Sequence, residues 1–440
     1  MLVLHVLNHF LPQQTAGTEV YTWALSKKLQ QQGIEVEIVI PHYGEPESAY
    51  YKHDGLPVFQ YAEPSVVDRS LMMGFRKPDG LKIFEEHVQN KKPAVVHFHE
   101  LAGSNGITVH HIIAAKSAGA KVVITFHLAG NTCKTGNLFY KEQVLCDGLI
   151  RLQKCSSCYL HAKGNKALNA LLLPVSSVFN QLGIDTTKWN SKAGTALGTV
   201  HIIERLKKNF ETLVQHCDKV VVLTDWYKKI LLLNGVREEK ICYVPQGLPF
   251  EVSVPAFDHK REKTVPIRLL FLGRINPFKG LHLLLEAMEE LDHEKIELDI
   301  YGNSDDEAYE ECWRNKTKSH SNIHWKGKLQ QAAVVPTMQQ YDALCLCSTF
   351  SEMSPLVIQE AFAAGIPVIA SNVYGNAEQI RHNENGLLFQ FKNINSLKEQ
   401  LNRCINEPSL IQQLKSKVQS PRSFQQVGDE YYKIYETLLS

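Results

Sequence analysis

The chain has 440 residues, of which 44% are hydrophobic and 21% charged, and its formal net charge is +1. This length predicts two or three domains, the composition is that of a soluble globular protein, and the near-neutral charge gives no support for a nucleic-acid partner. The first ten residues, MLVLHVLNHF, lack a basic lead and a cleavage site, and no apolar run reaches membrane-spanning length, so we expect neither a signal peptide nor a transmembrane helix.

The N-terminal residues predict a strand, followed by Ala16-Gly17-Thr18 at the start of a helix, a helix end at Gly33 and a second strand. Gly17 would let the backbone approach a ligand closely at that helix start. Residues 44–92 are less regular. We interpret them as a solvated loop with a partly buried helix, in preference to an acceptor or membrane contact.

Two further predicted strands end in histidines. His97 and His99 lie two residues apart, so they share one face of a strand end, and His127 follows the strand KVVITF. Ligands bind at the carboxyl ends of parallel strands, so His99 and His127 could form a metal site, a catalytic site or a packing contact. No third ligand at metal spacing is evident, and we expect no metal here.

Four cysteines follow within 26 positions: Cys133, Cys146, Cys155 and Cys158. Their number and the closing C-x-x-C resemble a tetrahedral thiolate zinc site, and we expect a structural zinc in an insertion at about residues 130–180. An iron–sulfur centre, two disulfides and plain thiols are the alternatives. Because the chain shows no export signal, a reducing compartment favours thiols or metal ligands over disulfides.

The rest of the first half is mostly helical from 161 to 212 and then contains two strands, and residues 250–265 look like a linker. The second half repeats the opening pattern of strand, glycine-bearing loop, helix and strand. Two such units predict an α/β protein with two doubly wound, Rossmann-like domains facing each other across a cleft. Arg274 and Lys279 stand in the loop that opens the first helix of the second half, where a fork donor and a point charge suit a diphosphate.

The most informative stretch is SEMSPLVIQEAFAAGIPVIAS at 351–371, which predicts a loop, a short helix, a turn and a strand. Ser354 is predicted to cap the helix, with Pro355 at its first position and Gly365 at its end. Glu352 precedes the helix and Glu360 lies within it. Two carboxylates able to hold hydroxyls thus flank a helix N-terminus that favours phosphate, which matches a nucleotide sugar. Dinucleotide-binding and P-loop signatures are absent.

These residues resemble a known family. The pattern G-R-x-x-x-x-K at 273–279, followed by E-x7-E at 352–360 and AFAAGIPVIAS, is similar to that of the retaining glycosyltransferases of family 4, which have the GT-B fold. The likeness extends to the Gly17 loop, VHFHE at 96–100, TFH at 125–127 and VPQG at 244–247. Two departures are Ala16 in place of the first glycine of a pair, and Pro355 in the second loop, which removes one N–H donor.

The resemblance implies a role for each matching position. Arg274 and Lys279 would neutralise the leaving diphosphate, Glu352 would contact the transferred sugar, and His127 would lie near the reacting carbon. Donor binding would involve Gly17, His99, Ser354, Leu356, Val357 and Glu360, the last through the ribose hydroxyls. The resemblance also implies that no catalytic metal is needed.

We therefore expect a retaining glycosyltransferase that moves a sugar, from a UDP-sugar by preference, to a glycan or lipid-linked acceptor in polysaccharide or glycoconjugate synthesis. The alternatives are a nucleotide-sugar 2-epimerase on the same fold and a non-catalytic scaffold. A cytoplasmic location is expected, with peripheral contact at the inner face of the membrane as an option. The expected domains are residues 1–250, a linker at 251–266, residues 267–422, and a C-terminal helix at 423–440 that crosses back to the first domain.

Overall fold

The computed structural model describes residues 1–64, 66–102, 105–164, 169–249, 266–304 and 306–440. The chain forms two compact units. The first comprises Met1–Pro245 together with Phe424–Ser440, and the second comprises Gln246–Ser423. The expected linker at 251–266 lies, apart from Pro266, outside the described residues.

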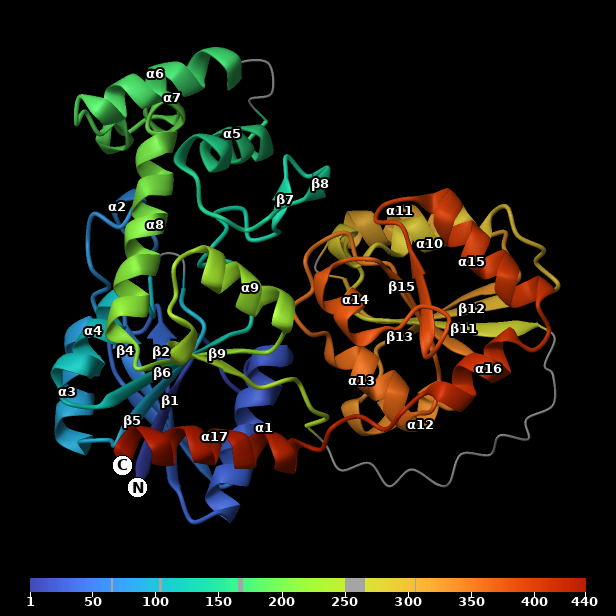
Figure 1. The fold of residues 1–440 in the computed structure, drawn as a ribbon, viewed down its shortest axis with the longest axis horizontal. Coiled ribbons are helices and arrows are strands. Elements are labelled where there is room, and N and C mark those ends of the chain that lie inside the picture. Colours follow the sequence, from blue (N-terminus) through green and yellow to red (C-terminus); the bar gives the residue numbers. More distant parts are fainter. Residues whose placement is uncertain (65, 103–104, 165–168, 250–265, 305) are drawn as a thin grey trace. The chain divides into compact units, whose positions relative to one another are not determined.

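The first unit is built on an eight-stranded sheet with the order β10-β9-β6-β5-β1-β2-β4-β3 (Figure 1). Its strands are β1 (Leu2–Val6), β2 (Glu35–Tyr43), β3 (Ala49–His53), β4 (Leu56–Glu63), β5 (Val95–His99), β6 (Lys121–Phe126), β9 (Lys219–Val222) and β10 (Ile241–Tyr243). All neighbours are parallel except β3 and β4. The chain reverses its direction of travel across the sheet between β1 and β5, where a parallel sheet opens a crevice for ligands.

Helices cover this sheet and extend beyond it. They are α1 (Gly17–Gln31), α2 (Arg69–Met72), α3 (Leu81–Lys91), α4 (Val109–Ser117), α5 (Leu152–Ala162), α6 (Asn169–Gln181), α7 (Lys192–Leu197), α8 (Thr199–His216), α9 (Asp225–Leu233) and α17 (Phe424–Leu439), with short 3-10 turns at Thr186–Lys188 and Glu238–Lys240. A small hairpin of β7 (Phe139–Tyr140) and β8 (Val144–Leu145) precedes α5. The last helix, α17, packs against α1.

The second unit has a six-stranded parallel sheet with the order β13-β12-β11-β14-β15-β16. Its elements are β11 (Ile267–Leu272), α10 (Leu281–Met288), β12 (Ile296–Tyr301), α11 (Glu307–Thr317), β13 (Ile323–Gly327), α12 (Val334–Met338), β14 (Ala343–Leu346), α13 (Leu356–Ala363), β15 (Val368–Ser371), α14 (Tyr374–Gln379), β16 (Gly386–Phe389), α15 (Ile394–Asn406) and α16 (Leu410–Lys417), with 3-10 turns at Pro277–Lys279 and Gln331–Ala333. This is the strand order of a dinucleotide-binding sheet, with its reversal between β11 and β14.

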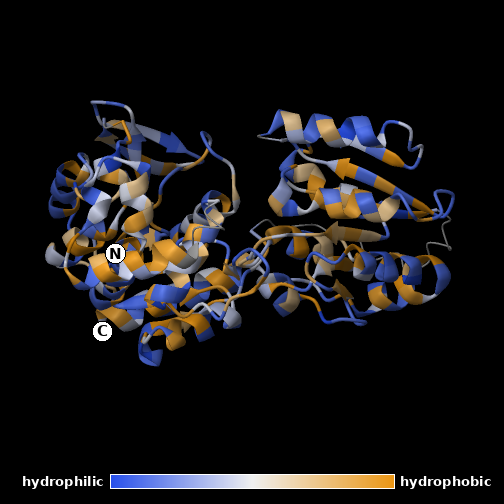
Figure 2. Ribbon diagram, turned by 90° about the horizontal axis from the view of Figure 1, so that it is seen from above, coloured by the Kyte–Doolittle hydropathy of each residue, from blue (hydrophilic) through white to orange (hydrophobic). Residues whose placement is uncertain are grey.

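Burial on both faces of this sheet explains its apolar strands. Leu269 and Phe271 of β11 pack into a core with α10 and α15, whereas Leu270 packs into a second core with α12 and α13. Neighbouring residues of a strand point to opposite faces, so both must be apolar. The helices in turn carry polar and apolar residues on different sides (Figure 2). The expected α/β fold with two Rossmann-like sheets is therefore confirmed.

Two local predictions were wrong. Residues 44–92 contain the strands β3 and β4 as well as the expected helix, α3. Ser354 does not cap α13, because the helix begins one residue later and its N-cap position is Pro355, without a side-chain hydrogen bond. None of the helices formed by the described residues combines the length and hydropathy that a bilayer-spanning segment needs.

Candidate nucleotide and sugar sites

The loop after β11 holds Lys279 in a fixed place in the second unit. The Asn276 carboxamide accepts a hydrogen bond from the Lys279 backbone N–H at 3.1 Å and so caps the 3-10 turn Pro277–Lys279. Gly280 follows with φ of 68°, and a Cβ there would lie 1.8 Å from the Cys347 carbonyl oxygen. Only glycine therefore permits this close approach between the loops after β11 and β14. Arg274 lies in the same loop with an exposed side chain.

Lys279 and Glu352 form an ion pair, with 2.7 Å between Nζ and Oε1. The Glu352 side chain is buried, and the Ser348 hydroxyl also donates to its Oε1 at 2.7 Å. The ammonium group lies 5.1 Å from the centroid of the Phe350 ring. The two loops that meet at the reversal of strand order thus present one cation and one carboxylate together. Burial of the pair makes the loss of either partner costly for the other.

The helix α13 begins directly after this carboxylate. Ser354, Leu356 and Val357 are half-buried at its start. Since no side chain caps this helix, its first N–H groups remain available to an anion, and the helix dipole favours negative charge there.

Glu360 lies in the second turn of α13 and is buried. Its Oε1 accepts a hydrogen bond of 2.6 Å from the Gln331 side chain, and burial raises the pKa of its carboxyl group above the usual value. A buried carboxyl group with a neighbouring amide can bind hydroxyl groups as acceptor or donor. Gln331 and Ser348 are contacts that the sequence did not indicate.

Gly375 is a further residue that the sequence analysis missed. A Cβ there would lie 2.0 Å from the Met353 carbonyl oxygen and 2.6 Å from that of Glu352. The Gly375 N–H donates to the Glu352 carbonyl oxygen at 3.0 Å. Gly375 therefore lets α14 pack directly against the backbone that carries Glu352.

In the first unit, Gly17 is the first residue of α1, and its N-cap, Ala16, makes no side-chain hydrogen bond. A Cβ on Gly17 would meet no atom within 4 Å, so the space beside this backbone is open. Open space and uncapped N–H groups are the features that an incoming phosphate requires.

Buried imidazoles line the switch point of the same sheet. His99 lies between His5 and His127, with Nε2 2.8 Å from His5 Nδ1 and Nδ1 3.2 Å from His127 Nε2. His97, on the same face of β5, lies 4.1 Å from His99 between ring centroids. His5 was missed because the sequence does not show that β1 and β5 are neighbours, whereas the structure pairs His5 with His97.

His97 continues the network to the C-terminal helix. Its Nδ1 lies 2.7 Å from the Tyr435 hydroxyl, and its Nε2 lies 2.8 Å from Thr125 Oγ1. Thr125 is in turn 2.8 Å from the Tyr431 hydroxyl, which accepts a hydrogen bond of 2.9 Å from Tyr21. Residues far apart in the sequence therefore form one buried polar network.

The expectation that no third ligand accompanies these histidines was wrong, since ring nitrogens of His5, His97 and His99 lie within 4.8 Å of one another. Hydrogen bonds engage both nitrogens of His97 and of His99, which favours the network over a metal at this point. Burial lowers the pKa of His5 and of His127 to about 3, so both rings are neutral at physiological pH.

Glu100 fixes the backbone at His127. Its carboxylate accepts hydrogen bonds from the N–H groups of His127 at 3.1 Å and Leu128 at 2.8 Å, and from the Asn131 side chain. Glu100 adopts φ of 77°, a left-handed conformation that is uncommon outside glycine. Burial raises the pKa of its carboxyl group to about 7. The strained backbone thus aims a buried carboxylate at the loop that follows β6.

Of the residues predicted to form a site, the second unit gathers Arg274, Lys279, Glu352, Ser354, Leu356, Val357 and Glu360 on the loops at its switch point and on α13. The first unit carries Gly17, His99 and His127 at its own switch point. The four cysteines line one small cavity beside β7, β8 and α5.

Comparisons with known proteins identify the family and the fold. Residues 256–420 match the family model for glycosyl transferases group 1, and residues 16–154 match that for the glycosyl transferase 4-like domain. The chain carries two glycosyltransferase domains on a GT-B fold. Two solved structures support the fold: sucrose-phosphate synthase from Thermosynechococcus elongatus (TM-score 0.67, 16% identity, 100% of this chain and 99% of that chain) and HepE from Anabaena in complex with UDP (TM-score 0.63, 14% identity, 100% and 99%).

Among curated sequences, the amylovoran biosynthesis glycosyltransferase AmsK of Erwinia amylovora is 26% identical over 203 residues, which are 44% of this chain and 49% of that protein. Alignments with the first curated relatives span between 48% and 63% of their length. The names of several curated relatives refer to the synthesis of polysaccharides.

Proposed function

We propose that the protein is a retaining glycosyltransferase that transfers a hexose from a nucleotide sugar, a UDP-sugar by preference, to a glycan or lipid-linked acceptor. The observation that carries the proposal is the Lys279–Glu352 ion pair at 2.7 Å. It lies beside the uncapped start of α13, the helix that also carries Glu360. The preference for UDP is supported by the solved neighbour HepE, which is in complex with UDP.

Binding of the donor would begin in the second unit. The diphosphate would take the N–H groups of Leu356 and Val357 and the positive charge of Arg274 and Lys279, and the ribose hydroxyls would bond to Glu360. As the bond from sugar to phosphate breaks, negative charge grows on the departing phosphate, and fixed cations stabilise that transition state more than the ground state. No metal ion is required in this scheme.

In the second unit, Glu352 would contact the sugar, and in the first unit the resemblance assigns sugar recognition to His127. His127 is neutral and its Nε2 is engaged by His99, so Nδ1 would face the sugar as a hydrogen-bonding group. Retention would follow from attack on the face that the phosphate leaves, with the phosphate accepting the proton of the acceptor hydroxyl.

The first experiment is thermal unfolding with UDP, GDP, ADP and dTDP. A ligand bound only by the folded chain stabilises it by about 2.7 kcal/mol at a hundredfold excess over its Kd, and we expect the largest shift with UDP. If none of the four nucleotides shifted the unfolding temperature, the proposal would be contradicted. Donor sugar incubated without acceptor should stay unchanged, since its conversion would instead reveal a 2-epimerase, and the anomeric configuration of the product, read by NMR, tests retention.

Lys279→Ala provides the matched test of the site. We expect it to lower kcat by at least about a hundredfold while the chain stays folded, because a charge that stabilises the transition state is lost. Lys398→Ala is the control, since Lys398 has the same 19% side-chain exposure and forms an ion pair of 2.6 Å with Glu290. Similar rates for both variants would exclude the assigned role of Lys279.

An exposed apolar stripe on α6 and the residue that follows it, Leu182, supports a lipid-linked acceptor and peripheral membrane contact. Leu171, Val175, Val178 and Leu182 recur at helical spacing and are 69%, 43%, 52% and 67% exposed. Lys188, Trp189 and Lys192 follow and are also exposed. Apolar residues with a tryptophan and lysines at their margin suit the interface of an anionic bilayer.

Co-sedimentation with vesicles tests this contact. The chain should sediment with vesicles that contain phosphatidylglycerol and less with pure phosphatidylcholine. The double variant Leu171→Glu/Leu182→Glu should remain in the supernatant, and Leu233→Glu/Leu439→Glu, which changes two exposed leucines elsewhere, should still sediment. The membrane contact would be refuted if the wild-type chain stayed in the supernatant. It would also be refuted if the double variant Leu171→Glu/Leu182→Glu abolished self-association of the chain and left its sedimentation with vesicles unchanged.

A further inference from the structure

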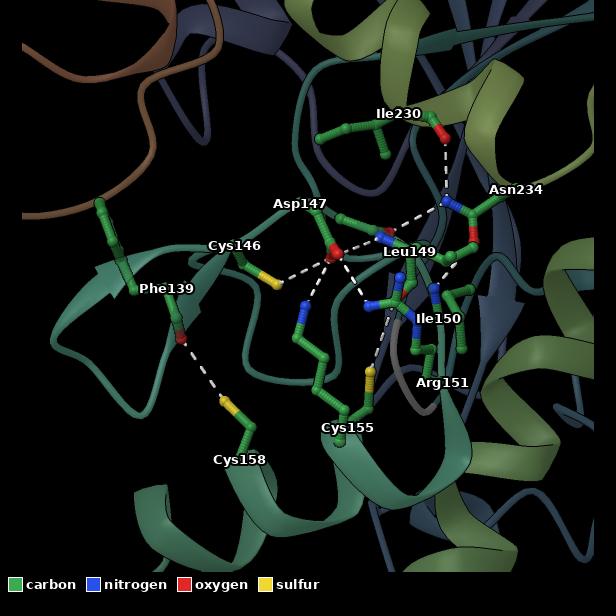
Figure 3. Close-up of polar contacts among 12 residues, drawn as sticks. Phe139, Cys146, Asp147, Leu149, Ile150, Arg151, Cys155, Cys158, Ile230 and Asn234 are labelled. Carbon is green, nitrogen blue, oxygen red and sulfur yellow. Dashed lines mark hydrogen bonds and ion pairs between the residues drawn. The ribbon is translucent and has the colours of Figure 1, made fainter.

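Four thiols converge on one cavity in the segment between β6 and α6. Cys133 precedes the hairpin, Cys146 follows β8, and Cys155 and Cys158 lie on α5. All four line the same small cavity. Figure 3 shows Cys158 of α5 directed toward the backbone of Phe139 in β7, and Cys155 of the same helix directed toward the segment that bears Leu149. The hairpin and α5 thus bring together four sulfur ligands from a segment of 26 residues, 133–158.

The hairpin is buried only at its base, where Phe139 is 2% exposed. From Tyr140 to Asp147 no residue is buried, and Val144 and Leu145 are 57% and 49% exposed. Each strand has two residues, and an isolated hairpin is at best marginally stable in water. Leu138, Lys141 and Glu142 have φ of 51°, 52° and 61°, a conformation that costs about 1–2 kcal/mol for such residues. Beyond Phe139, which is buried, the hairpin is strained and exposed, and a cross-link would supply the support that it lacks.

Local contacts of the thiols suit a thiolate centre. The Lys141 backbone N–H donates to Cys158 Sγ at 3.3 Å, and Cys155 and Cys158 are three residues apart on one face of α5. Lys134 and Lys154 line the same cavity. Four thiolates around a divalent ion carry a net charge of −2, which two ammonium groups would offset.

We propose that Cys133, Cys146, Cys155 and Cys158 bind one zinc ion as a structural site. Binding replaces the four thiol protons, which pass to solvent, and no oxidation state changes. Zinc–sulfur bonds of about 2.3 Å place tetrahedral sulfurs about 3.8 Å apart. In the described residues, no three of these four sulfur atoms all lie within 4.8 Å of one another. Side-chain rotation would therefore close the site as the ion binds.

The zinc would fix the far end of the loop that carries His127. Glu100 holds the near end at His127 and reaches Asn131, and the Thr132 hydroxyl lies 3.2 Å from the hydroxyl of Tyr227. Cys133 is the next residue. The zinc module therefore anchors the segment 127–133 from its downstream side, so its effect on transfer is one of positioning and stability.

Metal analysis of the full-length chain, purified under reducing conditions, tests the proposal directly. We expect one zinc per chain by elemental analysis, and cobalt substitution should give the d–d and charge-transfer absorption of a tetrahedral thiolate site. After denaturation with chelator, all ten cysteines should react with a thiol reagent. Iron in place of zinc, or a thiol count lowered by two for each disulfide, would overturn the proposal.

Cys155→Ser and Cys158→Ser should each lose at least about tenfold in zinc affinity, whereas Cys312→Ser, which changes an exposed cysteine on α11, should keep full zinc content. If the serine variants fail to fold, hydrogen exchange of the wild-type chain with and without chelator decides the matter. Chelation should speed exchange within 133–158 and leave β11–β16 unchanged. Zinc-free wild-type protein with the same exchange rates, or equal zinc in all variants, would refute the site. Neither result depends on whether the chain transfers sugars.

Discussion

Gly375 lacks a side chain, and this allows α14 to pack closely against the loop that carries Glu352. Gly375→Ala would put a methyl group 2.0 Å from the Met353 carbonyl oxygen. We expect the free energy of unfolding to fall by about 1–3 kcal/mol, as in other overpacked sites, and nucleotide affinity to fall with it. Chemical denaturation and calorimetric titration provide the measurement. Gly273→Ala, whose methyl would meet no atom within 4 Å, should leave the free energy of unfolding unchanged.

Buried neutral histidines make the first unit sensitive to acid. The pKa of His5 and of His127 is lowered from 6.5 to about 3 by burial, so between about pH 3 and 6.5 the unfolded chain binds more protons than the folded one. Stability is therefore lost as the pH falls through this window. His5→Gln should reduce the slope of the unfolding free energy against pH by up to about 1.4 kcal/mol per pH unit. An unchanged slope, or an equal change in His53→Gln, would argue against this origin.

Single residues of the candidate site were predictable to different degrees. Lys279, Glu352 and Glu360 stand in a spacing that the sequence alone makes visible, whereas the ion pair between the first two was not predicted. His5, Gln331 and Gly375 were not predictable, because each becomes informative only through a partner on another strand or helix. Nothing in the sequence distinguishes a functional histidine inside an apolar strand from one that only packs in the core.

At the scale of elements, α17 completes a network that begins on β1 and β5. Tyr431→Phe removes the hydroxyl that joins Tyr21 to Thr125, and two buried polar groups lose a partner. We expect a loss of about 1–3 kcal/mol in the free energy of unfolding. Tyr432→Phe, on the neighbouring residue of the same helix, serves as the control. Equal stability of both variants in urea denaturation would show that the network adds nothing.

Buried parallel strands were the easiest elements to predict, because strands such as Lys121–Phe126 and Ile267–Leu272 consist mostly of apolar residues. The strands β3 and β4 escaped for the opposite reason. β3 alternates between half-buried and exposed residues, and the second residue of β4 is Pro57, which argues against a strand in the sequence. The start of α13 was misplaced by one residue because Ser354 and Pro355 both satisfy the usual rules for a helix start.

At the scale of the whole molecule, the second unit is one continuous segment, Gln246–Ser423, whereas the first is not. We expect a fragment of residues 246–423 to fold alone and to bind the nucleotide, as read by a dispersed NMR spectrum and a saturable titration. A fragment of residues 1–245 should not reach the native state, since it lacks α17 and its two buried tyrosines. A stable, native-like 1–245 fragment would contradict this dependence.

The discontinuity of the first unit also sets an order of events during synthesis. Residues 246–423 leave the ribosome before Phe424–Leu439, so the second unit has its whole sequence available while the first still lacks its closing helix. His97 and Thr125 must wait, without their tyrosine partners, for the time in which about 180 residues are translated, which is roughly 10–40 s at common rates. During that interval the sheet, which has all its strands but lacks α17, is a natural substrate for chaperones. A chain whose synthesis stops after Ser423 therefore has a complete second unit, and the unit that was begun first is the one left incomplete.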